Sequence, residues 1–121
     1  MAKTILIIDD DMEYVESTAA TLQESGYTVI SRNNGSMGFE AAKAESPDLI
    51  LLDVMMRYDS EGLDTMGKLG GDPATRDIPI LLITGIRHPE DLPMQSDSIK
   101  GTLEKPVNPP VLLTAIEKAL R

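Results

Sequence analysis

The sequence predicts an α/β fold in which a five-stranded parallel sheet is covered by helices on both faces. Five short apolar runs alternate with segments whose apolar residues recur every three or four positions, which is the pattern of alternating strands and helices. Three of the runs are apolar at every position, as is typical of central strands that are covered on both faces. At 121 residues the chain has the length of one domain, so we expect a single domain spanning residues 1–121.

The five runs are bounded by turn residues or charges, and each is expected to form a strand. The second run contains Tyr27 and Thr28, and the fifth contains Lys100, Thr102 and Glu104, so these two strands are expected at the edges of the sheet. With right-handed crossovers, the strand order 2-1-3-4-5 satisfies this placement and gives a flavodoxin-like, doubly wound sheet. The runs are ILII at 5–8, YTVI at 27–30, LILL at 49–52, ILLI at 80–83 and the weaker run at 99–103.

The segments between the strands have helical spacing and recognisable ends. Asp11 is a candidate N-cap of the first helix, and Gly26 is a natural stop after it. Asn108 is expected to cap the last helix, with a proline at its first helical position. After strand four, Pro93 would remove a hydrogen bond, so the fourth helix is expected to be short, kinked or absent. The apolar positions are Met12, Val15, Ala19 and Leu22; Met37, Ala41 and Ala44; Leu63, Met66 and Leu69; and Val111, Leu112, Ala115, Ile116 and Ala119.

Composition and charge exclude several classes of function. The chain has no cysteine, which excludes disulfides, thiolate metal sites and a thiol nucleophile. Its aliphatic runs are far shorter than the roughly 18 residues that span a bilayer. The start of the chain also lacks the pattern of a signal peptide, so we expect a cytoplasmic protein with no membrane association. Eleven basic and twenty acidic residues give a net charge of −9, so we expect no direct binding of nucleic acid.

Acidic residues gather where two neighbouring strands are expected to end. Asp9, Asp10 and Asp11 follow the first run, and Asp53 follows the third. In an open parallel sheet, ligands bind outside the carboxyl ends of the strands, at the point where the strand order reverses. Here that point lies between strands one and three. A single aspartate there is most often a cap or turn residue, but two strand ends that both supply carboxylates are harder to explain by capping.

The same edge of the sheet carries the groups that phosphoryl transfer needs. Carboxylates about 5 Å apart repel each other by about 3 kcal/mol at an effective dielectric constant of about 20, so the site needs a compensating cation or a proton. Oxygen ligands at this density suit Mg²⁺, which would leave room for a phosphoryl oxygen. Thr84 ends strand four and Lys105 follows strand five, which adds a hydroxyl and an ammonium. Together these groups can neutralise a phosphoryl group that a carboxylate accepts in line.

Four segments give the chain a plain resemblance to the receiver domains of two-component response regulators. The segments occur in the order and approximate spacing of that family, and the match covers essentially the whole chain. A pair of aspartates alone would be a weak signal, whereas the four segments together are highly specific. They are ILIIDDD at 5–11, DLILLDVMM at 48–56, IPILLITG at 78–85 and LEKPV at 103–107.

The resemblance implies that the chain is a signalling phosphoacceptor and not an enzyme, although it would assist its own phosphorylation and dephosphorylation. Asp53 would accept a phosphoryl group from a phosphohistidine on a sensor histidine kinase or a phosphotransfer protein. Thr84 would contact the phosphoryl group and move on activation, and Lys105 would pair with it. A downstream protein partner, or an output domain outside this chain, would respond to the phosphorylated state; weak homodimerisation is left open.

The resemblance also implies the cofactor and its ligands. Mg²⁺ would be bound by Asp10 directly, by Asp9 mainly through water, and by Asp53. The backbone carbonyl of Met55 would be a further ligand.

Several positions depart from the pattern of the family. Thr102 stands three residues before the lysine, where the family has an aromatic switch residue, so we expect no aromatic rotation on activation. Met55 and Ile86 lie two residues after the acceptor and the switch threonine. The resemblance implies that side chains at these two positions flank the approach of water to the phosphoryl group. Here both are apolar and neither can orient a water molecule, so we expect them to be tuning positions that favour slow loss of the phosphoryl group.

Two other functions fit some of these residues. One is a receiver fold kept as a binding module without phosphorylation, against which the intact phosphorylation residues argue. The other is a haloacid-dehalogenase-like phosphohydrolase, with Asp9 as nucleophile and Asp11 as acid. That family needs a further acidic pair after its lysine, and here only Glu117 follows Lys105.

Overall fold

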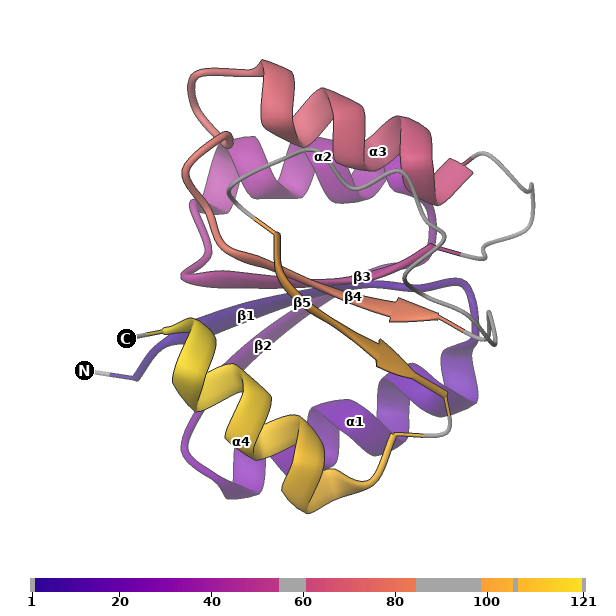
Figure 1. Cartoon of the computed structure of the whole chain (residues 1–121), viewed down its shortest axis with the longest axis vertical. Coiled ribbons are helices and arrows are strands. Elements are labelled where there is room, and N and C mark those ends of the chain that lie inside the picture. Colours follow the sequence, from indigo (N-terminus) through magenta and orange to yellow (C-terminus); the bar gives the residue numbers. More distant parts are fainter. Residues whose placement is uncertain (1, 55–60, 85–98, 106, 121) are drawn as a thin grey trace.

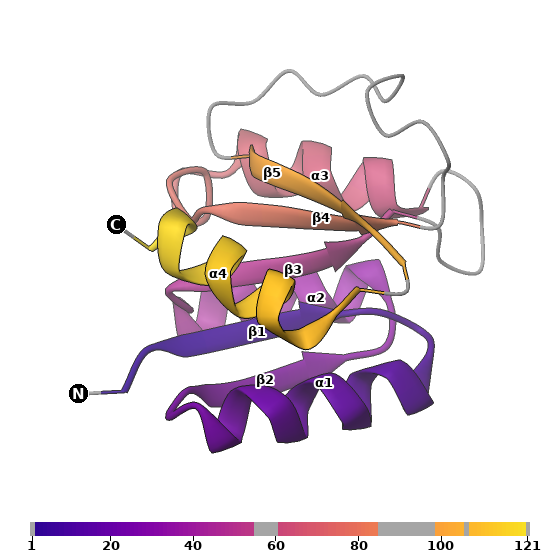
Figure 2. The same cartoon turned by 60° about the horizontal axis from the view of Figure 1, so that its bottom comes forward.

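Five strands form one parallel sheet in the order β2-β1-β3-β4-β5, which confirms the predicted topology. The computed structural model describes residues 2–54, 61–84, 99–105 and 107–120. Figure 2 shows the sheet with β2 and β5 at its edges, as their polar side chains predict. The strands are β1 (Thr4–Ile8), β2 (Thr28–Arg32), β3 (Leu49–Asp53), β4 (Ile80–Thr84) and β5 (Ile99–Glu104).

Helices cover both faces of the sheet, so the fold has three layers (Figure 1). Helices α2 (Gly35–Glu45) and α3 (Glu61–Gly71) lie on one face, and α1 (Met12–Glu24) and α4 (Pro109–Ala119) lie on the other. The predicted break in the fourth helix falls at 85–98, which lies outside the described residues. None of the helices within the described ranges combines the length and apolar character that a membrane span requires.

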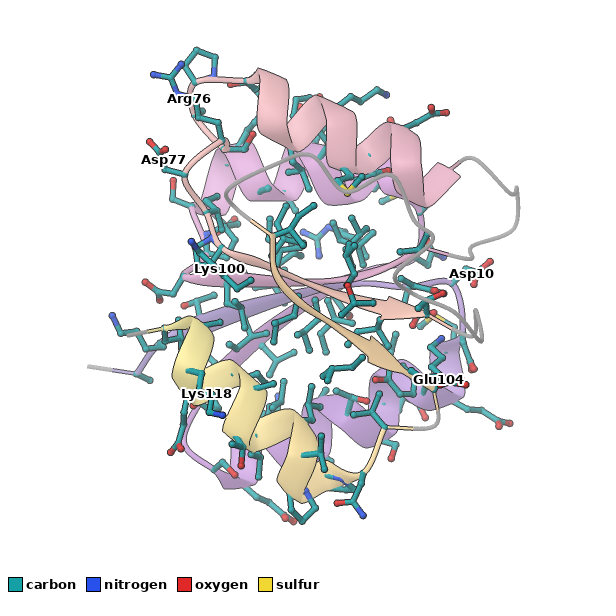
Figure 3. All side chains as sticks on the ribbon, viewed as in Figure 1. Asp10, Arg76, Asp77, Lys100, Glu104 and Lys118 are labelled. Atoms are coloured by element: carbon teal, nitrogen blue, oxygen red, sulfur yellow. The ribbon has the colours of Figure 1, made fainter. Side chains whose placement is uncertain are left out.

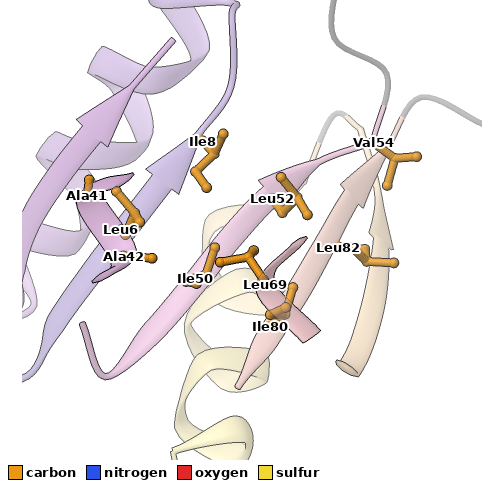
Figure 4. Packing of buried hydrophobic residues seen from close by; sticks show 10 residues of the cluster. All are labelled: Leu6, Ile8, Ala41, Ala42, Ile50, Leu52, Val54, Leu69, Ile80 and Leu82. Atoms are coloured by element: carbon orange, nitrogen blue, oxygen red, sulfur yellow. The ribbon is translucent and has the colours of Figure 1, made fainter. Parts of the chain in front are cut away.

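Side chains of the central strands alternate between two cores, one on each face of the sheet. Leu6 and Ile8 of β1 face α2 and α3, whereas Ile5 and Ile7 face α1 and α4. The alternation follows from the two-residue period of a strand, and it requires an apolar residue at every position of a strand covered on both faces. Figure 4 shows the first core: Leu6, Ile8, Ala41, Ala42, Ile50, Leu52, Val54, Leu69, Ile80 and Leu82. The second contains Ile5, Ile7, Val15, Leu22, Leu49, Leu51, Leu81, Ile83, Leu112 and Ile116.

Two local features differ from the prediction. Strand β2 continues to Arg32 because each of its residues pairs with β1 through the backbone, which does not require apolar side chains. Asn108 occupies the N-cap position of α4, but its side chain forms no cap hydrogen bond. Pro110 at the second position of the helix has no N–H to donate to the cap, and the amide of Val111 at the third position does not bind the Asn108 side chain.

Gly38 allows α2 to lie close against β1, where Ile8 is fully buried. A Cβ at residue 38 would lie 2.5, 2.7 and 2.9 Å from three side-chain atoms of Ile8. We expect Gly38→Ala to lower the free energy of unfolding by about 1 kcal/mol, because overpacking costs more than the gain in helix propensity returns. Gly67→Ala in α3 is the matched control, since nothing lies within 4 Å of its added Cβ. Urea unfolding measures both variants, and equal stability would contradict the close packing at Gly38.

Candidate functional site

The carboxyl ends of four strands bring the predicted site residues to one edge of the sheet. Asp9 directly follows β1, Asp53 ends β3, Thr84 ends β4 and Lys105 directly follows β5. The backbone fixes these ends relative to each other: the amide of Asp9 donates to the carbonyl of Arg32 at 3.1 Å, and the amide of Lys105 donates to the carbonyl of Thr84 at 2.7 Å. In Figure 3, Asp10 and Glu104 lie at this end of the molecule, toward which the arrows of β4 and β5 point.

Three carboxylates converge at this edge. One carboxylate oxygen from each of Asp9, Asp10 and Asp53 lies within 4.8 Å of the others. Asp9 and Asp53 are buried, and Asp10 is more exposed. Asp11 does not belong to this group, because its Oδ1 accepts a hydrogen bond from the amide of Tyr14 at 3.2 Å and caps α1. The sequence therefore predicted both the convergence of three aspartates and the capping role of the fourth.

The ammonium of Lys105 lies between the two buried carboxylates. Its Nζ is 2.9 Å from Oδ2 of Asp9 and 3.4 Å from Oδ2 of Asp53. The side chains of Asp9 and Asp53 are only 2% and 3% exposed, and that of Lys105 is 21% exposed. Burial by itself lowers the pKa of Lys105, but Asp9 and then Asp53 raise it, and the net pKa lies above the ordinary value of 10.5. Lys105 is therefore a fixed positive charge at neutral pH.

Tyr14 is a site residue that the sequence did not predict. Its ring lies in the third position of α1, and the Nζ of Lys105 is 4.5 Å from the ring centroid. Burial raises the pKa of the Tyr14 phenol, while Thr18 and Lys105 act in the opposite direction. The hydroxyl is buried without a hydrogen bond of ordinary geometry. In the sequence, an aromatic residue near the start of an amphipathic helix indicates core packing. Its contact with Lys105 is seen only in the tertiary structure.

The two threonines that the sequence singled out both lie in the strands beside the site. Thr84 is fully buried at the end of β4. Thr102 is half-buried in β5, where it pairs with Leu82. The backbone of β5 thus continues past the position of the aromatic switch without an aromatic side chain. Met55 and Ile86, and with them the predicted metal carbonyl and the two tuning positions, lie outside the described residues.

The donor set fits Mg²⁺. All three converging groups are carboxylates, which are the hard oxygen ligands that this ion prefers. Oδ2 of Asp9 is buried and accepts no hydrogen bond of ordinary geometry, although the ammonium of Lys105 lies beside it. The Lys105 ammonium contacts the carboxylates of Asp9 and Asp53, and its single positive charge cannot balance a cluster of three carboxylates, so a further cation would lower their repulsion. Asp9, Asp10 and Asp53 are the residues that could hold it.

We expect the protein to lose stability as the pH rises above about 10. Burial raises the folded pKa of Tyr14 above 10.0, and a group with a raised folded pKa contributes stability that is fully present below its unfolded pKa. That contribution is lost as the pH rises through the folded pKa. Lys105 and Tyr27 act in the same direction, because their pKa values are raised as well. Between pH 8 and about pH 11, the free energy of unfolding measured with urea should fall less in Tyr14→Phe than in the unsubstituted chain. An equal fall in the two proteins would contradict the burial of the phenol.

Comparison with known proteins identifies the family. Residues 5–117 match the response regulator receiver domain family. The chain is 38% identical over 122 residues to the phosphoglycerate transport system transcriptional regulatory protein PgtA of Salmonella typhimurium. This alignment covers 98% of this chain and 28% of PgtA. The chain is also 32% identical over 123 residues to the phosphate regulon transcriptional regulatory protein PhoB of Pseudomonas aeruginosa. This second alignment covers 100% of this chain and 53% of PhoB.

The fold comparison agrees with the sequence comparison. A CheY-like response regulator receiver domain protein from Methanospirillum hungatei superposes with a TM-score of 0.84 at 29% identity, over 99% of this chain and 94% of that one. The chain thus spans about a quarter of PgtA and about half of PhoB, and nearly all of a separate receiver domain. The strand order, the converging aspartates and these matches together place the chain in the receiver domain family of two-component response regulators.

Proposed function

We propose that Asp53 accepts a phosphoryl group from a phosphohistidine on a sensor histidine kinase or a phosphotransfer protein, and that this modification is how the receiver domain signals. One observation carries the proposal. The carboxylate of Asp53 lies at a strand end, within 4.8 Å of the carboxylates of Asp9 and Asp10, with the Lys105 ammonium 3.4 Å away. This arrangement offers a nucleophile, a site for Mg²⁺ and a fixed positive charge around one atom.

The transfer follows from these positions. An oxygen of Asp53 attacks phosphorus in line, an O–P bond forms as the P–N bond to the donor imidazole breaks, and the electron pair stays on that nitrogen. Bound Mg²⁺ would supply positive charge to the carboxylates and the phosphoryl oxygens. Lys105 contacts a phosphoryl oxygen in place of the Asp53 oxygen it now approaches. The hydroxyl of Thr84, at the end of the adjacent strand, hydrogen-bonds another.

Chemical phosphorylation tests the proposal. On incubation with acetyl phosphate and Mg²⁺, we expect the intact chain to gain the mass of one phosphoryl group. Asp53→Asn should abolish the gain, because an amide cannot replace the carboxylate nucleophile. Asp77→Asn is the matched control: this exposed aspartate lies away from the site (Figure 3), and the variant should be modified like the unsubstituted chain.

The same experiment separates the two alternatives. A binding module would gain no mass under any condition. A phosphohydrolase would release phosphate continuously, would depend on Asp9 as nucleophile, and would still act in Asp53→Asn. A gain of mass in Asp53→Asn equal to that of the unsubstituted chain would contradict the assignment of the acceptor.

The proposal extends to location and output. The chain would act in the cytoplasm, where phosphohistidine donors of this kind are made. PgtA and PhoB are transcriptional regulatory proteins of which this chain matches only a part. We therefore place the output in a downstream protein partner or in an output domain, and we assign none of it to direct nucleic-acid binding by these residues, since the net charge is −9.

A further inference from the structure

The ring of Tyr14 and the carboxylates of the site hold the Lys105 ammonium from two sides. Nζ lies 4.5 Å from the ring centroid, 2.9 Å from Oδ2 of Asp9 and 3.4 Å from Oδ2 of Asp53. Tyr14 comes from the first turn of α1 and Lys105 from the end of β5, so the contact joins opposite ends of the chain. An aromatic face attracts a cation most strongly where water is partly excluded, which is the case for this half-buried lysine.

A series of contacts leads from Asp9 through Asp11, Tyr14 and Lys105 back to Asp9. Oδ1 of Asp9 accepts from the amide of Asp11 at 2.9 Å, and Oδ1 of Asp11 accepts from the amide of Tyr14 at 3.2 Å. The Tyr14 ring contacts Lys105, whose Nζ returns to Asp9 at 2.9 Å. Asp11, which caps α1, therefore links the backbone of Tyr14 to the acidic cluster, and the ring extends from that backbone to Lys105.

We propose that Tyr14 is a positioning residue for phosphoryl transfer, whose ring holds the Lys105 ammonium at the place where the phosphoryl group on Asp53 will need it. The inference rests on the proposed function of Asp53. A lysine has four rotatable side-chain bonds, and its ammonium is strongly hydrated, so an unrestrained Lys105 would spend part of its time in solvent. The ring reduces that freedom without competing for the hydrogen bonds that the phosphoryl oxygens require.

The proposal separates the ring from the hydroxyl. The hydroxyl of Tyr14 is buried without a hydrogen bond of ordinary geometry, and Thr18 is the side chain that acts most strongly on its pKa, so the contact with Lys105 is made by the ring. Tyr14→Phe keeps the ring, whereas Tyr14→Leu keeps apolar volume and removes the aromatic face. Tyr14→Met is a second variant without an aromatic face, in case leucine packs poorly. We expect the phenylalanine variant to behave like the unsubstituted chain and the other two to differ from it in the same direction.

Two measurements test the inference. The first is the rate of phosphorylation by acetyl phosphate at saturating Mg²⁺, which should stay within about twofold in Tyr14→Phe and fall roughly fivefold in Tyr14→Leu and Tyr14→Met. The second is the proton NMR shift of the Lys105 Hε atoms, which the ring current should move upfield in the unsubstituted chain and in Tyr14→Phe only. A double-mutant cycle of Tyr14→Leu with Lys105→Met, measured by urea unfolding, should show that the two changes are not additive.

The outcomes distinguish this inference from the proposed function. If Asp53 is phosphorylated and Tyr14→Leu and Tyr14→Met are modified as fast as the unsubstituted chain, the inference is wrong and the proposed function stands. If both variants are slow but the cycle is additive and the Hε shift is unchanged, Tyr14 acts through packing and the inference is again wrong. If Asp53→Asn is modified like the unsubstituted chain, the proposed function fails instead.

Discussion

Adding about 10 mM Mg²⁺ should raise the melting temperature of the chain by about 3 to 6 °C. With a dissociation constant of about 1 mM, binding to the folded state alone adds about 1.4 kcal/mol to the free energy of unfolding. The physical reason is the charge of the site, since three carboxylates lie within 4.8 Å of one another and the Lys105 ammonium contacts only those of Asp9 and Asp53 among them. At this separation the pair of Asp9 and Asp53 repel each other by about 3 kcal/mol at an effective dielectric constant of about 20.

Substitutions locate the effect. Asp10→Asn should remove most of the shift, because Asp10 is the most exposed of the three carboxylates and the one best placed to meet an ion from solvent. Asp77→Asn removes an exposed carboxylate away from the site and should keep the full shift. Sodium chloride at the same ionic strength should not reproduce it. An equal shift in Asp10→Asn would show that Mg²⁺ stabilises the chain somewhere else.

The fold could be predicted from the sequence because the central strands are short and every position in them is apolar, which indicates burial on both faces of the sheet. The runs at 5–8, 49–52 and 80–83 have no polar residue, so only the centre of a sheet covered on both faces suits them. The strands predicted at 27–30 and 99–103 contain polar residues, so they are placed at the two edges of the sheet. Strand ends were less predictable: β2 runs to Arg32 on backbone pairing alone, and this does not appear in a pattern of side-chain polarity.

The placement of the site residues was predictable, but the contacts between them were not. The predicted site residues all end or follow an apolar run, and parallel strands bring such positions to the same edge of the sheet. These residues are Asp9, Asp10, Asp53, Thr84 and Lys105. That Lys105 lies closer to Asp9 than to Asp53 depends on differences of a few tenths of an ångström in tertiary structure.

Strand β5 shows a second limit of sequence reasoning. Ile80 pairs with Ile99 but Leu81 pairs with Gly101, so the register shifts by one residue within the strand. A shift of one residue changes which face each later side chain meets. The polar pattern of 99–103 is compatible with either register, so the sequence predicted the strand but not this irregularity. The shift precedes Lys105 and therefore helps to determine where its side chain is directed.

Replacing Lys105 by methionine should lower the free energy of unfolding by about 3 kcal/mol at neutral pH without Mg²⁺. Methionine keeps much of the length and apolar volume of lysine and removes its charge. The side chains of Asp9 and Asp53 are 2% and 3% exposed, and both contact the Lys105 ammonium. Removing one partner of a buried ion pair costs about 3 to 5 kcal/mol, and the lower end applies because Lys105 is 21% exposed.

Lys118→Met is the matched control for this change. Lys118 is exposed on α4, away from the acidic cluster (Figure 3), so its replacement should change stability by no more than about 0.5 kcal/mol. Mg²⁺ should stabilise Lys105→Met by more than it stabilises the unsubstituted chain, because the ammonium and the metal ion both neutralise Asp9 and Asp53. An equal Mg²⁺ effect in the two proteins, measured by thermal unfolding, would mean that Lys105 and the metal ion do not act on the same carboxylates. The larger effect that we expect would show that Lys105 opposes the binding of Mg²⁺ at these carboxylates.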